Sequence, residues 1–157
     1  MTELPDSARR VADAAAAAGI AIDVVQMPDS TRTAEDAAAA CGCAVAQIVK
    51  SLIFVGAETG RPYLLLVSGV NRVDETGIAG LLGEPLKRPD GKTVRELTGY
   101  AIGGIPPIGH PAPMPTVIDE TLLTFDTVWA AAGTPRCVFA SDPNALKDAT
   151  GARAYAF

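Results

Sequence analysis

The segment 100–115 limits the fold of this chain more than any other feature of its sequence. It combines Gly103, Gly104 and Gly109 with five prolines between positions 106 and 115. Proline lacks the backbone N–H and clashes with the preceding helical turn, so it ends helices and interrupts central strands. The segment therefore predicts a long loop, and the regular structure must lie before and after it.

The part of the chain before this loop carries helix and strand signals in irregular alternation. Thr33 and Asp90 stand where a side-chain oxygen caps the first turn of a helix. The β-branched residues of segment 20–25 predict a buried strand, and two apolar runs around a turn at Gly60 predict a hairpin. We expect helices at 5–18, 33–42, 73–82 and 90–97, and strands or extended segments at 20–27, 48–55, 63–68 and 85–88.

The part after the loop is shorter and richer in strands. Asp142 can cap a helix that begins with Pro143, where the missing N–H of proline costs no hydrogen bond. The 157 residues and the hydrophobic fraction of 48% suit one core, so we expect a single domain over residues 1–157. We expect strands at 116–118, 128–131 and 136–140, a helix at 143–149, and an edge strand near Tyr155 and Phe157.

Composition and charge argue against several classes of protein. The alanine-rich uncharged stretches 14–21 and 37–47 are shorter than the ~20 apolar residues of a membrane span. Glu3 and Asp6 stand where a signal peptide would be basic. A net charge of −5 lacks the signature of proteins that coat duplex DNA. We therefore expect a cytoplasmic protein without a membrane or a duplex DNA partner.

The cysteines predict neither a disulfide framework nor a metal site. Cys41 and Cys43 are one residue apart, Cys137 is distant, and His110 is the only histidine. A zinc site needs about four well-spaced ligands, and an odd number of cysteines in a chain of this size is typical of a reducing compartment. We expect no metal and no cofactor.

Lys50 is the first candidate functional residue. It lies between Val49 and Ser51 in an otherwise apolar run, where desolvation disfavours a charged amine unless it reaches water, a carboxylate or an anionic ligand. The structural alternative is that Lys50 extends its head group into solvent while its neighbours face the core. The pattern alone favours this alternative.

The 100–115 loop is the second candidate. Its glycines would let a ligand approach the peptide groups closely, and its prolines would hold that surface in shape beforehand. The glycine spacing fits neither a P-loop nor a dinucleotide-binding motif. His110 could act as a general base or hold a water molecule. The structural alternatives are an irregular crossover between strands and a histidine bonded to the backbone.

A small basic cluster is the third candidate. Lys87, Arg88, Lys92 and Arg95 outnumber Asp90 within one short stretch, which is enough for a patch that faces a phosphate. A solvated helix face is the alternative, and it is the simpler interpretation of the cluster taken by itself.

Four motifs occur in a recognisable order: TAEDAA at 33–38, IVKSLIF at 48–54, GGIPPIGH at 103–110 and VWAAAG at 128–133. Together they resemble the YbaK/EbsC family, free-standing relatives of the prolyl-tRNA synthetase editing domain, over about residues 20–155. The resemblance implies a single α+β domain in which helices surround a mixed, largely antiparallel, barrel-like sheet. It also implies hydrolysis of a mischarged aminoacyl-tRNA, commonly tRNA(Pro) carrying a small amino acid.

The resemblance also implies a set of site residues. Lys50 falls on the family's required lysine, which is expected to engage the terminal adenosine or its phosphate. Gly103 and Gly104 fall in the loop whose backbone holds the aminoacyl ester, and His110 matches the branch of the family with a Gly-His pair after the prolines. These four form the expected catalytic set. The residues expected to bind the substrate are Met27, Thr33, Ile53, Ser68, Ile105, Pro106 and Gly109.

This site needs no protein nucleophile. An aminoacyl ester is already activated, so a positioned water or the substrate's own terminal hydroxyl, with backbone stabilisation of the oxyanion, can suffice. The expected partner is the acceptor end of an aminoacyl-tRNA, and an aminoacyl-tRNA synthetase is a further candidate partner.

Two other functions stay open at this point. The same pocket could belong to a non-catalytic module that binds an aminoacyl-like or nucleotide ligand or docks on a synthetase. A hydrolase that uses the thiol of Cys41 or Cys137 is the other alternative, and it predicts an activity that alkylation destroys.

Overall fold

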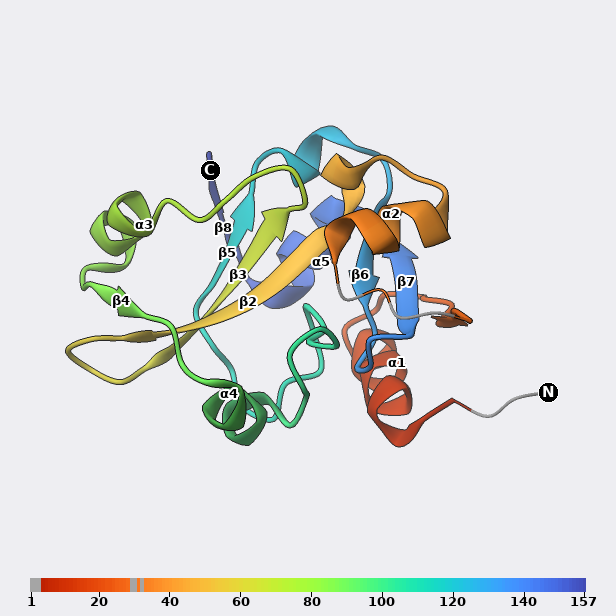
Figure 1. The fold of residues 1–157 in the computed structure, drawn as a ribbon, viewed down its shortest axis with the longest axis horizontal. Helices are drawn as coiled ribbons and strands as arrows, with labels where there is room; N and C mark the ends of the chain where they lie inside the picture. The colour runs from red at the N-terminus through yellow and green to blue at the C-terminus, as the bar shows by residue number, and fades with distance from the viewer. Residues whose placement is uncertain (1–3, 29–30, 32) are drawn as a thin grey trace.

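The computed structural model describes residues 4–28, 31 and 33–157 (Figure 1). Within these residues the chain forms a mixed α+β domain with five α-helices and eight strands, as the sequence predicts. The helices are α1 (Asp6–Ala17), α2 (Ala34–Cys41), α3 (Glu75–Leu82), α4 (Gly91–Thr98) and α5 (Pro143–Thr150), and short 3₁₀ turns span Val45–Gln47 and Leu122–Thr124.

The helix starts follow the predicted capping residues. Thr33 Oγ1 accepts a hydrogen bond from the Asp36 N–H at 3.0 Å, and Asp90 Oδ1 accepts one from the Thr93 N–H at 2.7 Å. Each cap satisfies one of the backbone donors that a helix leaves free in its first turn. These caps fix where α2 and α4 begin, and both helices border the site described below.

The strands form two sheets. One sheet has the order β4 (Leu86–Lys87), β2 (Val49–Gly56), β3 (Pro62–Ser68), β5 (Thr116–Asp119) and β8 (Arg153–Tyr155). The other has the order β1 (Val25–Gln26), β7 (Cys137–Ser141) and β6 (Val128–Ala131). A parallel bridge between Ile48 and Trp129 joins the two sheets just before β2 begins.

The prediction of a mixed, largely antiparallel sheet is confirmed. Only the β3–β5 and β5–β8 pairs are parallel, and the β2–β3 hairpin pairs from Val49 and Ser68 to Val55 and Pro62. The barrel-like description fits only loosely, because both sheets stay open.

The prediction of a buried strand over segment 20–27 is wrong for most of its length. Only Val25–Gln26 pairs, with the start of β7, and Val25 is 39% exposed. Ile20, Ile22 and Val24 instead pack, partly buried, against the main core. Their β-branched side chains find an apolar surface without a strand partner, which local pattern cannot distinguish from a sheet.

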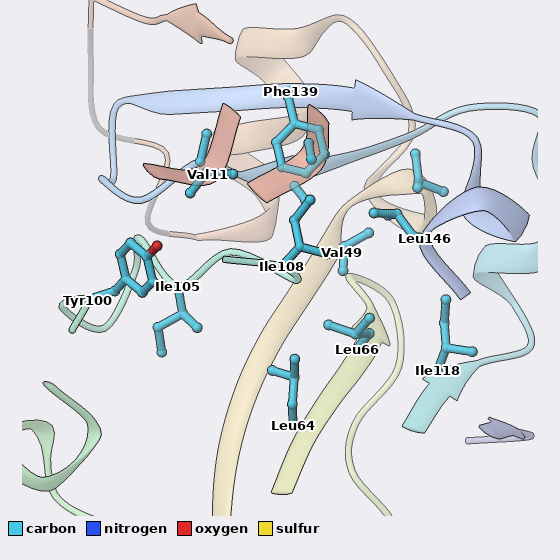
Figure 2. Close-up of a cluster of buried hydrophobic side chains, with 14 of the residues drawn as sticks. Val11, Val49, Leu64, Leu66, Tyr100, Ile105, Ile108, Ile118, Phe139 and Leu146 are labelled. Carbon is cyan, nitrogen blue, oxygen red and sulfur yellow. The ribbon is translucent and has the colours of Figure 1, made fainter. Parts of the chain in front are cut away.

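The main core explains how the 100–115 loop is held (Figure 2). Ile105 and Ile108 of the loop are buried in the same cluster as Val49 of β2 and Leu64 of β3. The Tyr100 hydroxyl donates to the Gly109 carbonyl at 2.7 Å. Burial of these apolar side chains anchors the loop beside β2 without regular secondary structure.

The part of the chain that the structure describes contains no helix that is both long enough and apolar enough to cross a membrane.

Candidate functional site

A cavity of about 620 Å³ lies along one edge of strand β2. The opposite edge of β2 pairs with β3 along its length. On the cavity side, the described strands reach β2 only at its two ends, through the Ile48–Trp129 bridge and the pairing of Val55 and Gly56 with β4. The middle of β2 therefore forms the floor of the cavity with a free backbone edge.

Four other segments form the cavity walls. These are the start of α2, the segment from β4 into α4, the glycine-rich part of the 100–115 loop, and β6 with its neighbour β7. In Figure 1 they surround the middle of β2. The lining residues outside β2 are Thr31, Thr33, Ala34, Ala37, Cys41, Ile48, Arg88, Pro89, Val94, Ile102, Gly103, Ile105, Trp129, Ala130, Ala131 and Val138.

Lys50 lies in the cavity lining together with both of its neighbours on β2. Side chains alternate along a strand, so Lys50 shares a face with Phe54, while Val49 and Ile53 face the main core and Ile105. The cavity is lined from both faces because, within the described residues, no strand pairs with the middle of this edge of β2. Lys50 and the loop thus border one hollow although their side chains start on opposite faces.

The Lys50 ammonium is held by a buried polar network. Its Nζ donates to the backbone carbonyl of Asn71, and the Asn71 side chain donates to Asp119 Oδ2 at 2.8 Å and to Thr121 Oγ1 at 3.1 Å. Asp119 is fully buried and also accepts from the Ser68 N–H at 3.0 Å. Among the described residues the ammonium has this one hydrogen-bond partner, so two of its three donors remain for water or a ligand.

Burial and nearby charges act in different directions on Lys50. Burial lowers the pKa of its ammonium, the neighbouring Arg72 lowers it further, and the carboxylates of Glu35 and Asp119 raise it. A partly desolvated cation beside a cavity interacts more strongly with an anion than a cation in water does. The arrangement favours a ligand that carries a phosphate or another electron-rich oxygen.

The two adjacent glycines of the loop, Gly103 and Gly104, have different roles. Gly103 lines the cavity with a φ of 95°, a left-handed conformation that favours glycine. The backbone of Gly104 is already used, because its N–H donates to Ala101 and its carbonyl accepts from Gly133. A Cβ on Gly104 would meet the Thr134 Cα at 2.7 Å. Gly104 therefore fixes the loop against the β6–β7 turn, and Gly103 presents backbone to the cavity.

The structure brings some of the predicted substrate-binding residues to this cavity. Thr33, Ile53 and Ile105 line it. Met27, Ser68 and Pro106 do not belong to its lining. Ser68 is fully buried, and its hydroxyl donates to the Ala46 carbonyl at 2.7 Å, so its visible role is to support the network behind Lys50.

His110 and Gly109 line a different cavity, of about 300 Å³, that borders α1 and α5. His110 Nε2 lies 2.8 Å from the Pro106 carbonyl, and a carbonyl only accepts, so Nε2 carries the proton. Burial lowers the pKa of His110 more than this hydrogen bond raises it. The structure thus shows His110 bracing the proline turn, apart from the cavity that Lys50 lines.

Ser51 and Trp129 line the cavity but were not among the candidate site residues, whereas Arg88 belongs to the predicted basic cluster. Ser51 has a buried hydroxyl without a hydrogen-bond partner in the described residues, and Trp129 is the only tryptophan of the chain. Arg88 lies over the Phe54 ring at 5.2 Å and pairs with Glu75 at the surface. The basic cluster at 87–95 pointed to Arg88, whereas nothing local in the sequence marked Ser51.

The thiols near the cavity are poorly suited to nucleophilic chemistry. Cys41 lines the cavity, but burial, with a smaller contribution from Cys43, raises the pKa of its thiol to about 11. Only the thiolate is a strong nucleophile, so Cys41 is almost entirely unreactive near neutral pH. In the described ranges, no three His, Cys, Asp or Glu residues form a group that could hold a metal ion.

Comparison with known proteins assigns the chain to a family. Residues 28–149 match the family model of the aminoacyl-tRNA editing domain. The chain belongs to that family. The matched segment contains the editing domain's open strand, its glycine-rich loop and the whole lining of the larger cavity.

Solved structures resemble the editing domain over almost its full length. A candidate trans-editing enzyme for prolyl tRNA synthetase is 51% identical, with 98% of each chain covered and a TM-score of 0.92. A protein from computational work on epitope backbone grafting onto scaffolds is 48% identical, with 98% of this chain and 97% of that chain covered and a TM-score of 0.90. A hypothetical protein is 31% identical, with 94% and 97% covered and a TM-score of 0.87. Among curated proteins the sequence finds no match.

Proposed function

We propose that this editing domain hydrolyses the ester bond of a mischarged aminoacyl-tRNA, with a small amino acid on tRNA(Pro) as its substrate. The observation that carries the proposal is the single cavity shared by the Lys50 cation, the Gly103 backbone and the free edge of β2. The family membership and the 51% identical candidate trans-editing enzyme support it.

The cavity has the size and lining for the end of an aminoacylated chain. Its volume of about 620 Å³ lies within the ~300–1,000 Å³ typical of sites for small ligands. Ala34, Ala37 and Ala131 line part of the wall, and these short side chains leave space for the adenosine and a small amino acid. Ile102 is 58% exposed and lies at the lining, where it can cover a bound nucleoside.

Lys50 would bind the phosphate or the ribose of the terminal adenosine. Its ammonium has two donors left after the bond to Asn71, and the network through Asp119 restrains its position. Holding the reacting ester in one geometry supplies a large part of the barrier reduction in such a reaction.

The bond changes balance without a protein nucleophile. The oxygen of a water molecule adds to the ester carbonyl carbon, the bond from that carbon to the ribose oxygen breaks, and the ribose oxygen takes the proton that water loses. The products are the free amino acid and a tRNA with an unesterified terminal hydroxyl. The Gly103 backbone would stabilise the negative oxygen that develops on the carbonyl, and the terminal hydroxyl next to the ester could orient the water.

The contact with tRNA would be local. The chain has a net charge of −5, so its overall field does not attract nucleic acid. Arg88 stands at the cavity lining, and Lys87, Lys92 and Arg95 lie on the adjacent β4 and α4. These residues would face the phosphates of the acceptor end.

The test is a panel of mischarged tRNAs with the purified protein. Alanine, serine, cysteine and threonine on tRNA(Pro), and each on its cognate tRNA, would be incubated with the protein, and release of the amino acid would be followed. We expect release of at least one small amino acid from tRNA(Pro) and none from its cognate tRNA. Binding without turnover, seen as a change in Trp129 fluorescence, would instead support a non-catalytic binding module.

A further inference from the structure

The hydrogen-bond register of the β2–β3 hairpin decides which backbone groups of β2 face the cavity. The Gly69 N–H donates to Ile48, and the Gly56 N–H donates to Arg61, each at 2.9 Å. Hydrogen-bonded positions alternate with non-bonded ones along an antiparallel ladder. The even-numbered residues of β2 therefore bond to β3, and the odd-numbered residues direct their N–H and C=O groups to the other edge.

Ser51 and Ile53 are the odd-numbered residues in the middle of that free edge, and only Ser51 of the two adds a hydroxyl. Val49 adjoins the bridge to β6, and Val55 pairs with β4, whereas no strand of the described chain pairs with β2 on the cavity side between these ends. The Ser51 hydroxyl is also buried without a partner among the described residues. Buried polar groups are costly to leave unbonded, so an N–H, a C=O and a hydroxyl at one residue point to a ligand with complementary groups.

We propose that Ser51 binds the aminoacyl group of the substrate as if that group were one residue of an antiparallel strand. The Ser51 carbonyl accepts from the α-ammonium of the substrate, and the Ser51 N–H donates to the ester carbonyl oxygen. One residue of a hydrogen-bonded antiparallel pair offers this donor and acceptor on the same edge. The inference rests on the proposed hydrolysis and names the residue that reads the amino acid.

This pairing fixes the direction of the substrate side chain. Directly opposed residues of an antiparallel pair place their side chains on the same face of the sheet. An L-amino acid therefore directs its side chain beside the Ser51 hydroxymethyl group, on the face of Val49 and Ile53, and a D-amino acid would direct it toward the face of Lys50. Ser51 becomes the residue that limits side-chain size and selects chirality.

The first experiment compares L-alanyl and D-alanyl esters on the same tRNA(Pro). The two esters are diastereomers whose uncatalysed hydrolysis is measured alongside, so a difference in kcat/KM beyond that background comes from the protein. We expect the L-ester to be hydrolysed at least tenfold faster. Equal rates for both enantiomers would overturn the pairing and leave the proposed hydrolysis intact, whereas no turnover of any ester in the panel would overturn the hydrolysis and this inference with it.

The second experiment uses glycyl and L-alanyl esters with Ser51→Val. The added methyl groups would occupy the space beside the substrate side chain, which the glycyl ester lacks. We expect the alanyl-to-glycyl ratio of kcat/KM to fall at least tenfold relative to the unchanged protein. The matched control is Ser141→Val on β7, outside the cavity, which should leave the ratio unchanged. An unchanged ratio in folded Ser51→Val would remove Ser51 from the site.

The third experiment removes the Ser51 N–H itself. Ser51→Pro deletes a donor that faces the free edge and no bond to β3, and proline is tolerated on strand edges of this kind. Ser51→Ala keeps the N–H and is the comparison. We expect folded Ser51→Pro to lose at least tenfold more activity on the L-alanyl ester than Ser51→Ala. Equal activity of the two variants would contradict the role of the N–H, and if Ser51→Pro does not fold, the enantiomer comparison decides.

Discussion

Two buried carboxylates, Glu84 just before β4 and Asp119 at the end of β5, have different roles. Glu84 is 6% exposed and accepts hydrogen bonds from the Thr59 and Glu58 N–H groups, the Thr59 hydroxyl and the Tyr63 hydroxyl. These bonds, with that of Tyr63 the strongest influence, lower the pKa of Glu84 to about 2. Every partner belongs to the β2–β3 turn or its flank, so the network closes on itself and stabilises the hairpin.

Asp119 begins a network that ends at the cavity. Its oxygens accept from the N–H groups of Ser68 and Thr121 and from the Asn71 side chain. The Asn71 carbonyl then accepts from the partly exposed Lys50. The comparison suggests a division of roles: a polar network that closes on itself contributes to stability, whereas a network that ends on a cation beside a cavity fixes the position of that cation. Changes at the two networks should therefore separate stability from activity.

Of these changes, Lys50→Ala should give the largest difference between its effect on activity and its effect on stability. It removes the cation that we propose holds the substrate and leaves the core unchanged, so we expect deacylation to fall at least about 100-fold, with the Tm within a few degrees of the unchanged protein. Single-turnover deacylation and thermal unfolding measure the two effects. The matched control is Lys147→Ala on α5, which should keep full activity, and a folded Lys50→Ala protein with full activity would remove Lys50 from the site.

Asn71→Ala should also lower the deacylation activity, but less than Lys50→Ala does. The variant keeps the carbonyl that binds Lys50 and deletes the side chain that ties it to Asp119 and Thr121. We expect an activity loss of about tenfold, in the range for one lost hydrogen bond to a charged group. In a Lys50→Ala background the Asn71 change should have no further effect, because the two act as one unit. Additive losses would show that Asn71 acts independently of Lys50, and Asn144→Ala on exposed α5 is the control.

Glu84→Gln should have the opposite effects: it should lower the stability of the protein and leave catalysis per folded molecule unchanged. The pKa of Glu84 is depressed from its ordinary 4.5 to about 2, so its contribution to stability is complete above about pH 4.5 and is lost as the pH falls toward 2. Denaturant unfolding at neutral pH and near pH 3 should show the gap between Glu84→Gln and the unchanged protein narrowing in acid. A gap independent of pH would contradict the charge-based network. Glu58→Gln, exposed on the same turn, serves as control.

Alkylation with iodoacetamide should have the smallest effect on deacylation activity. The pKa of Cys41 is about 11 and that of Cys43 is also raised by burial, so few thiolates exist near pH 7. We expect brief treatment at that pH to leave deacylation unchanged, as measured beside an untreated sample. Rapid inactivation would instead support the alternative in which a cysteine thiol is the nucleophile of the hydrolase.

The sequence predicted those parts of the fold whose signals are local. Thr33 and Asp90 cap helices because the cap and its partner are three residues apart, and the β2–β3 hairpin follows from two apolar runs around one turn. The prediction of a buried strand at segment 20–25 was wrong, because the apolar side chains of this segment pack on the core without a strand beside them. Secondary structure that depends on a distant partner could not be inferred from pattern alone.

The candidate site was predictable in part for the same reason. Lys50 stood out as a charge in an apolar strand, and Gly103 stood out as unhindered backbone. The Asn71–Asp119 contact joins residues 48 positions apart, and the free edge of β2 depends on where β4 and β6 end. His110 follows Gly103 closely in sequence, yet the loop carries it to the other cavity. Distances along a loop do not specify which hollow its residues will face.

A crystal structure with a non-hydrolysable substrate analogue tests the central claim most directly. The analogue would be adenosine with L-alanine joined to the ribose through an amide in place of the ester. We expect the ribose within reach of Lys50 Nζ and the alanyl group hydrogen-bonded to the free edge of β2 at Ser51. Density for the analogue in the cavity beside His110, or outside both cavities, would contradict the account.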